Sequence, residues 1–451
     1  MGHHGLVSSD VTPGTSPSTA DLADRYASVM PSFLHTLYDD AVSIERGEGG
    51  YVYDVEGNRY LDFFGGVLTT MIGHSHPAVV AAVQEQAAKV MHTSTLFLSE
   101  PMIRLAEEIA RVSGIPDARV FFTTSGSEAN ETALLLATSF RKSNQILALR
   151  NSYHGRSFAT QAVTSHRGWR STANSGLSVN FVHGGYRLRS PFRGLDDEAY
   201  TQACVSDLIQ TIDMMTAGDV AAMIAEPIQG VGGFVVPPDG FFGAIHKVLD
   251  SHDILFVSDE VQTGWGRTGD HFWGYQAHGV VPDILTFAKG AGNGLALAGV
   301  VARAEIMDTI DVNSFSTFGG NPLSAAGGLA TLGVVLGENL QANALERGRQ
   351  IETVLDPLVG ATDWIAERRG RGLMHALEIV HPANASGGED ELVPDPQRTA
   401  RLVDRCRVGG LLLGMGGLYG NVVRIAPMLN VTEAELSAGL GVLGDAVRAL
   451  D

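Results

Sequence analysis

The sequence predicts an α/β protein in which a mostly parallel sheet is covered by helices. The first observation is a series of short, continuous apolar segments, such as "DILTFA" at 283–288, without the alternation of a half-exposed strand. The second is that helical patterns, such as "EANETALLLATSF" at 128–140, lie between these segments. Strands that alternate with helices are typical of a buried parallel sheet, and ligands bind beyond the carboxyl ends of such strands.

The elements can be placed in order along the chain. Residues 50–62, "GYVYDVEGNRYLD", have the alternation and the Gly-Asn turn of a hairpin, and two helical patterns follow between 78 and 113. We expect strands at 118–124, 145–150, 219–227, 254–260, 283–288 and 297–305, and further helices at 128–140 and 240–251. Residues 323–358 have a helical pattern that ends the sheet-forming region.

The chain of 451 residues is too long for one simple core. Its remainder, from 359 on, mixes short strand patterns with two helices and indicates a smaller α+β unit. Residues 1–22, rich in Ser, Thr, Gly and Pro, are expected to be a flexible leader. We expect the small domain to combine residues 23–77 with 339–451, and the large domain to span 78–338.

Composition excludes several classes of function. The net charge of −19 argues against nucleic-acid or anionic-membrane partners, which need clustered Lys and Arg. No apolar run reaches the roughly 18 residues of a membrane span. The two cysteines, Cys204 and Cys406, are far apart and lack neighbours at metal-ligand spacing, which favours reduced thiols in a cytoplasmic protein. We expect no metal site.

Lys289 is one of four lysines in a chain that has 27 arginines, and it follows a predicted strand in the uncharged segment "FAKGAGNG". One interpretation is a lysine that reaches from a strand end to water. The other is a catalytic amine, because burial lowers the pKa of lysine and yields the neutral form that imine formation needs. Arginine does not deprotonate in proteins and cannot form an imine.

Two other segments also end strands. In "TTSGSEANE", 123–131, Ser125, Gly126 and Ser127 would present free backbone N–H groups at a helix N-terminus, which is an anion site. The alternative is an ordinary N-cap by Ser127, with Asn130 or Glu131 closing a capping box.

Asp259 and Glu260 end the strand 254–260, where at least one of these desolvated carboxylates should have a cationic partner. A phosphate cradle, a carboxylate for a ring nitrogen and a lysine for an aldehyde are the three handles of pyridoxal phosphate.

From about residue 25 to its end, the chain resembles the class III aminotransferases, which are pyridoxal-phosphate enzymes of fold type I. Nine segments in the family's order carry the resemblance, and no single one is specific. They are "GHSHP" (73–77), "SGSEANE" (125–131), "SYHGR" (152–156), "AEPIQGVGG" (225–233), "SDEVQTGWGRTG" (258–269), "PDILTFAKGAGNG" (282–294), "STFGGNP" (316–322), "GRGLMHALE" (370–378) and "VRIAP" (423–427).

The resemblance implies a role for each matching position. Lys289 would hold the cofactor as an internal aldimine and move the proton in ping-pong half-reactions, and Asp259 would keep the ring nitrogen protonated. Val261 would pack on one ring face, Tyr153 would cover the other, and Gln262 would lie near the 3′-oxygen. Further matches are Ser125, Gly126 and Ser127 as the phosphate loop, His154 in the turn with Tyr153, Glu226 as a supporting carboxylate, Thr317 as a phosphate ligand donated by the neighbouring subunit of a homodimer, and Arg424 as the ligand of the substrate α-carboxylate.

Two departures bear on the substrate. Ornithine- and 4-aminobutyrate-type enzymes carry a glutamate that masks the arginine, where this chain has Val231; ornithine enzymes carry a tyrosine where it has Val67. "HFWGYQAHGVVPDILTFAKGAGNG" and "LYGNVVRIAPML" look most like the alanine–glyoxylate and ω-aminotransferase type. This resemblance implies transfer from L-alanine or an ω-amine to a small 2-oxo acid such as glyoxylate or pyruvate.

The apolar residues Phe63, Phe64, Val67, Leu68 and Phe97 are either the wall that receives the amine or core residues. Rival hypotheses remain open on the same scaffold: a 4-aminobutyrate/2-oxoglutarate enzyme, a biosynthetic aminotransferase for a specialised aldehyde, an aminomutase or a dialkylglycine decarboxylase.

Overall fold

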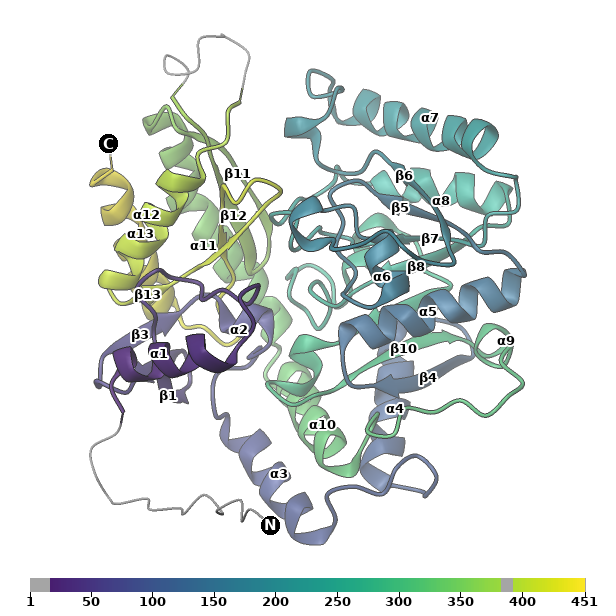
Figure 1. The fold of residues 1–451 in the computed structure, drawn as a ribbon, viewed down its shortest axis with the longest axis horizontal. Coiled ribbons are helices and arrows are strands. Elements are labelled where there is room, and N and C mark those ends of the chain that lie inside the picture. Colours follow the sequence, from purple (N-terminus) through teal and green to yellow (C-terminus); the bar gives the residue numbers. More distant parts are fainter. Residues whose placement is uncertain (1–16, 383–391, 451) are drawn as a thin grey trace, which may run out of the picture.

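The computed structural model describes residues 17–382 and 392–450, whose strands form three sheets (Figure 1). In the largest sheet β10 is antiparallel to both of its neighbours, and the strands from β9 to β6 all run parallel to one another. From edge to edge this sheet contains β4 (Ala118–Thr123), β10 (Ala298–Arg303), β9 (Ile284–Phe287), β8 (Leu255–Asp259), β7 (Ala222–Ala225), β5 (Gln145–Leu149) and β6 (Ser178–Val182). The predicted mostly parallel sheet is confirmed.

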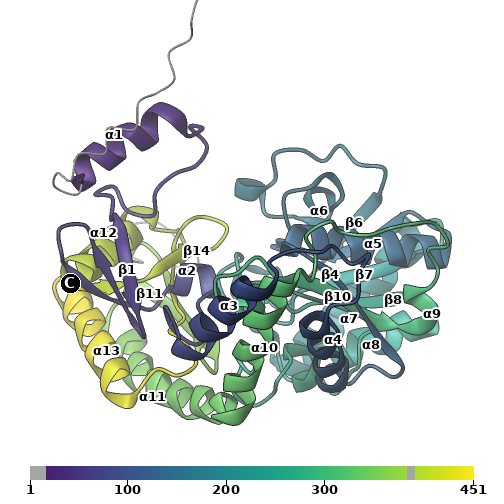
Figure 2. The same ribbon diagram turned by 90° about the horizontal axis from the view of Figure 1, so that it is seen from below.

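Helices cover both faces of this sheet. Figure 2 shows α5 (Gly126–Arg141) and α6 (Phe158–Val163) on one face, and α4 (Glu100–Ser113), α7 (Asp197–Met215) and α8 (Phe241–Ser251) on the other. All residues of β5, β7, β8 and β9 are buried, which explains why these strands are continuously apolar. Because these strands are parallel, their carboxyl ends meet at one edge and bring together segments that are far apart in the sequence.

The two smaller sheets lie beside the large one (Figure 1). The first contains β1 (Ile44–Glu48), β2 (Tyr51–Asp54), β3 (Arg59–Asp62) and β13 (Leu411–Leu412), and the second β11 (Ile365–Arg371), β12 (Met374–Ile379), β15 (Val422–Ile425) and β14 (Gly414–Gly416). Strand β13 pairs parallel with β3, so the N- and C-terminal parts of the chain share a sheet. We therefore propose the domain boundaries near residues 77 and 338.

The remaining elements connect or cover these sheets. Helix α10 packs against α3 and α4 beside the large sheet, while α11, α12 and α13 pack on the smaller ones. Their bounds are α1 (Thr19–Val29), α2 (Gly65–Leu68), α3 (Pro77–Lys89), α9 (Ala304–Met307), α10 (Pro322–Gly337), α11 (Leu340–Ala361), α12 (Pro396–Val408) and α13 (Glu433–Arg448), with 3-10 turns η1 (Arg167–Trp169), η2 (Arg187–Arg189), η3 (Gly274–His278) and η4 (Lys289–Gly292).

Several elements were not predicted from the sequence, among them β6, β1 and α7. Strand β6 lies at the edge of the sheet and is only partly buried, so its apolar pattern is weak. Strand β1 is almost wholly exposed, and α7 is a long helix that begins at an Asp196 cap. The expected leader is wrong for residues 19–22, because Ser18 and Asp21 form a capping box that starts α1 at Thr19. Residues 1–16 lie outside the described part of the chain.

Across 17–382 and 392–450, no single helix has both the length and the apolar character to cross a membrane, although α10 and α11 meet that test together as a bent pair.

Candidate active site

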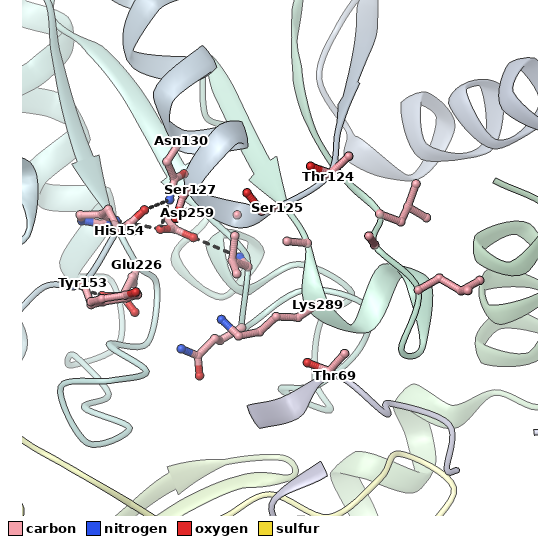
Figure 3. Close-up of a pocket in the computed structure, with 18 residues that line it drawn as sticks. Thr69, Thr124, Ser125, Ser127, Asn130, Tyr153, His154, Glu226, Asp259 and Lys289 are labelled. Carbon is pink, nitrogen blue, oxygen red and sulfur yellow. Dashed lines mark hydrogen bonds and ion pairs between the residues drawn. The ribbon is translucent and has the colours of Figure 1, made fainter. Parts of the chain in front are cut away.

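Lys289 lies where the buried strand β9 ends and the turn η4 begins. Its backbone adopts the left-handed conformation, with φ of 47°, and its half-buried side chain lines a cavity of about 300 Å³ (Figure 3). Burial lowers the pKa of the Lys289 amine, the nearby charges of Asp259 and Glu226 oppose this shift, and Arg424 adds to it. The net lowering favours the neutral, nucleophilic amine.

Asp259 ends the neighbouring strand β8 and lines the same cavity. Its Oδ2 lies 2.7 Å from Nδ1 of His154 and accepts a hydrogen bond of 2.7 Å from Nδ2 of Asn130 (Figure 3). The Asn130 amide is oriented in turn by the Thr286 hydroxyl, which donates to its Oδ1 at 2.7 Å. The Val261 N–H donates to the other carboxylate oxygen, Oδ1, at 3.2 Å. The carboxylate is thus held by three donors and remains able to accept a further hydrogen bond from a ring nitrogen in the cavity.

Glu260, the next carboxylate, has a structural role. It is fully buried, and burial raises its pKa. Its oxygens accept hydrogen bonds from the backbone N–H groups of Gly274 and Tyr275, each at 2.8 Å, and from the hydroxyls of Ser258 and Thr263. Glu260 is therefore compensated by backbone and hydroxyl donors. The carboxylate that contacts a histidine is Asp259.

The N-terminus of α5 forms another wall of the cavity, with Ser125, Gly126 and Ser127 among its lining residues. Ser125 is the N-cap, and its side chain accepts from the Glu128 N–H at 3.2 Å. The expected cap by Ser127 is wrong, because the Ser127 hydroxyl instead accepts from the Arg156 N–H at 3.1 Å. The free amides at this helix end are placed to bind an anion, as helix N-termini commonly do.

Gly155 brings the turn after β5 against this helix end. Its φ is +140°, and an added Cβ would lie 2.6 Å from Oγ and 2.9 Å from Cα of Ser127. The same turn places Tyr153 and His154 in the cavity wall. Burial raises the pKa of the Tyr153 hydroxyl, and its ring packs edge-on against Trp169 with centroids 5.7 Å apart.

Glu226 supports the loop that follows β7. Its oxygens accept from the backbone N–H groups of Tyr153 at 3.0 Å and Gly230 at 2.8 Å. Burial raises its pKa, and the charge of Asp259 raises it further against the effect of His154. Val261 and Gln262 also line the cavity, and Gln262 packs directly on the Gly230 backbone, where a Cβ would lie 2.3 Å from its amide.

Other expected residues lie outside the cavity wall. Thr317 is exposed and is not one of the residues that line the cavity of its own chain. Arg424 is buried on β15, with its guanidinium 5.6 Å from the ring centroid of Phe64. Val67, in α2, is half-buried with a φ of 66°.

The apolar residues Phe63, Leu68 and Phe97 were expected to form either the wall that receives the amine or part of the core. Phe63 and Leu68 belong to the packed core. Phe97 is exposed.

Several lining residues were missed. Asn130 appeared in the sequence only as a possible capping partner, and its contact with Asp259 depends on the packing of α5 against β8 and β9. Thr69, Thr124 and the segment 295–297 also reach the cavity. The segment "SGSEANE" at a strand end could have suggested Asn130, because its spacing from Gly126 places it one turn into the helix.

The chemistry of this cavity fits pyridoxal phosphate. Lys289 would take its aldehyde, Asp259 its ring nitrogen and the N-terminus of α5 its phosphate. Oε1 of Gln262 is buried without a hydrogen-bond partner among the described residues, which leaves this amide for a ligand. Within residues 17–382 and 392–450, no group of three or more His, Cys, Asp and Glu side chains is placed to hold a metal.

Fold and site together define a pyridoxal-phosphate enzyme that acts on amines. The chain belongs to the class III aminotransferase family, whose model matches residues 36–447. It is a transaminase of fold type I that uses pyridoxal phosphate.

Three known proteins illustrate the similarity. The mitochondrial alanine–glyoxylate aminotransferase 2 homolog 2 of Arabidopsis thaliana is 38% identical over 427 residues, which cover 93% of this chain and 86% of the relative. A thermostable (S)-enantioselective omega-transaminase from Thermomicrobium roseum superposes with a TM-score of 0.87 at 31% identity, covering 96% and 99% of the two chains. An amine transaminase from an uncultivated Pseudomonas species, in its PLP-bound form, gives a TM-score of 0.86 at 31% identity and covers 94% and 98%.

Proposed function

We propose that this transaminase moves an amino group from L-alanine or an ω-amine to a small 2-oxo acid such as glyoxylate or pyruvate. The environment of Arg424 carries this proposal. Its buried guanidinium lies between the rings of Phe64 and Phe234, 5.6 and 5.3 Å from their centroids, and donates one long hydrogen bond of 3.4 Å to the Gly230 carbonyl. Its Nε has no hydrogen-bond partner among the described residues.

A buried guanidinium in this position is poorly compensated, and burial lowers its pKa to about 10. A substrate carboxylate would compensate it through bidentate hydrogen bonds. The residue after Gly230 is Val231, which carries no side-chain carboxylate to compete for Arg424. The two similar transaminase structures and the alanine–glyoxylate aminotransferase from Arabidopsis support the same class of substrates.

The side chains of the cavity divide the chemical work. Bound pyridoxal phosphate supplies an aldehyde that carries the amino group and a ring that accepts electron density. Lys289, whose pKa burial lowers, would take and return the proton at the substrate carbon. Asp259 would hold its negative charge beside the ring nitrogen because His154 and Asn130 fix its position. Arg424 would orient the acid substrate.

The active form is proposed to be a homodimer. Thr317 is exposed on its own chain and would complete the phosphate site of the neighbouring one. The exposed apolar residues Leu96, Leu98 and Phe318 are candidates for the interface, because isolated chains rarely leave neighbouring apolar side chains in water. We also propose a cytoplasmic location, which the two free, buried cysteines support.

Half-reactions test the proposed substrates. Holoenzyme is mixed with single amines or amino acids, and the visible absorption of the cofactor is followed without any acceptor. L-Alanine or an ω-amine should bleach the band, and pyruvate or glyoxylate should restore it. Restoration by 2-oxoglutarate alone would contradict the proposal. Arg424→Gln should raise the KM for the 2-oxo acid at least tenfold while cofactor affinity changes less than twofold, and equal losses in both would contradict the role of Arg424.

A further inference from the structure

Positive charge is concentrated in one stretch of this acidic chain. Residues 132–195 contain no Asp or Glu, although the whole chain has 50 acidic residues and 31 Lys and Arg. The cations of this stretch are Arg141, Lys142, Arg150, Arg156, Arg167, Arg170, Arg187, Arg189 and Arg193. Arg187 and Arg189 form ion pairs with Asp197 and Glu378, whereas within the described residues Arg150 and Arg170 have no carboxylate at ion-pair distance.

Arg150 and Arg170 both line a groove of about 740 Å³ along the edge strand β6. Arg150 directly follows β5, and Arg170 directly follows the turn η1. The groove also has an apolar lining, to which Phe181 of β6, Met215 of α7 and Leu418 contribute. None of the residues that line this groove lines the cavity with Lys289, so the two hollows are separate.

Two polar side chains of the groove, Arg170 and Ser165, keep donor groups that no described residue uses, whereas the amides of Asn151 and Asn180 donate to the carbonyls of Gly232 and Met215. The guanidinium of Arg170 lies 5.4 Å from the ring centroid of Phe181, and its Nε is buried without a partner among the described residues. Ser165 accepts a hydrogen bond from the Ser152 N–H at 3.0 Å, which leaves its hydroxyl proton to donate. Asp207 of α7 is occupied by the His183 N–H at 2.7 Å and does not line the groove.

We propose that this groove binds an oxyanion carried on an apolar body, either a carboxylate or a phosphate monoester. Two unpaired guanidinium groups suit the oxyanion, since planar N–H donors pair with carboxylate and phosphate oxygens. The lining side chains Phe181, Met215 and Leu418 suit the apolar body, and the volume lies within the range of small-molecule sites. None of the residues that line the groove is Asp or Glu, so no carboxylate in its wall opposes an anion there.

Calorimetric titration of holoenzyme tests this site with two probes, 3-phenylpropionate and phenyl phosphate. The Arg424→Gln variant is used throughout, so that binding at the substrate arginine does not contribute. We expect one binding event per chain for at least one probe, weakened by added salt. Arg170→Gln and Arg150→Gln should each weaken it at least fivefold. The tighter probe shows whether the natural ligand carries a carboxylate or a phosphate.

Arg167→Gln is the matched control, because Arg167 is an exposed cation of the same stretch that does not line the groove. It should change the affinity less than twofold. The neutral 3-phenylpropionamide should not bind. Absence of binding by both anions, equal loss in Arg167→Gln, or equal binding of the amide would each overturn the proposal. The cofactor band and the melting temperature of each variant test whether it is folded. If one groove variant does not fold, the other still gives the comparison with Arg167→Gln.

Discussion

Asn130→Ala is the substitution whose effect can be worked out most directly from the site. Nδ2 of Asn130 donates to the charged Oδ2 of Asp259 at 2.7 Å and to the His154 carbonyl at 2.8 Å, and its Oδ1 accepts from Thr286 at 2.7 Å. A buried hydrogen bond to a charged group contributes roughly 1.5–3 kcal/mol, and each neutral one about 1 kcal/mol. The loss of all three should destabilise the protein by about 4 kcal/mol.

The same change should weaken cofactor binding, because Asp259 loses one of the two side chains that donate hydrogen bonds to it. We expect the dissociation constant of the cofactor to rise about tenfold, which corresponds to about 1.4 kcal/mol. Thermal unfolding with and without cofactor, and absorbance titration of the apoenzyme, measure the two effects. Asn144→Ala is the control, since this exposed asparagine donates one hydrogen bond of 2.7 Å to the Gly176 carbonyl. If Asn130→Ala melts and binds cofactor like the control, the network does not hold Asp259.

Three further outcomes are expected. Because burial lowers the pKa of Lys289, the rate at which apoenzyme binds cofactor should rise with pH, with a midpoint below the roughly 10.4 of an exposed lysine. Stopped-flow absorbance measures this rate. A midpoint at or above that value would contradict the burial argument. Gly155→Ala should cost about 1–2 kcal/mol for its positive φ, plus the clash with Ser127, and lower phosphate and cofactor affinity together in equilibrium titrations; unchanged affinity would refute the close approach. Arg369→Gln removes one partner, at 2.7 Å, of the buried carboxylate Glu378 and should destabilise the enzyme by roughly 3–5 kcal/mol in urea unfolding, whereas a loss below about 1 kcal/mol would show that the remaining partners suffice.

The sequence was informative where residue type and chemistry coincide. Lys289 was singled out because an amine, unlike a guanidinium, can form an imine, and because an anion site and a carboxylate are expected at other strand ends. Asp259 was singled out because a carboxylate after an apolar strand must be compensated. The order of buried strands predicted the sheet, since parallel strands are apolar on both faces. The carboxyl ends of adjacent strands β8 and β9 then had to place these two side chains near one another.

What the sequence by itself determined is therefore the fold class and the candidate amine and carboxylate, Lys289 and Asp259. Only the tertiary structure decided that Asn130 and His154 are the groups that hold Asp259, because those contacts join residues 129 and 105 positions apart. It also decided that Ser125 is the cap of α5, that Arg424 lies between two phenylalanine rings, and that Arg150 and Arg170 share a groove. Periodicity indicates which face of an element is buried. Which residues contact that face depends on how distant elements pack, and the local sequence does not determine this.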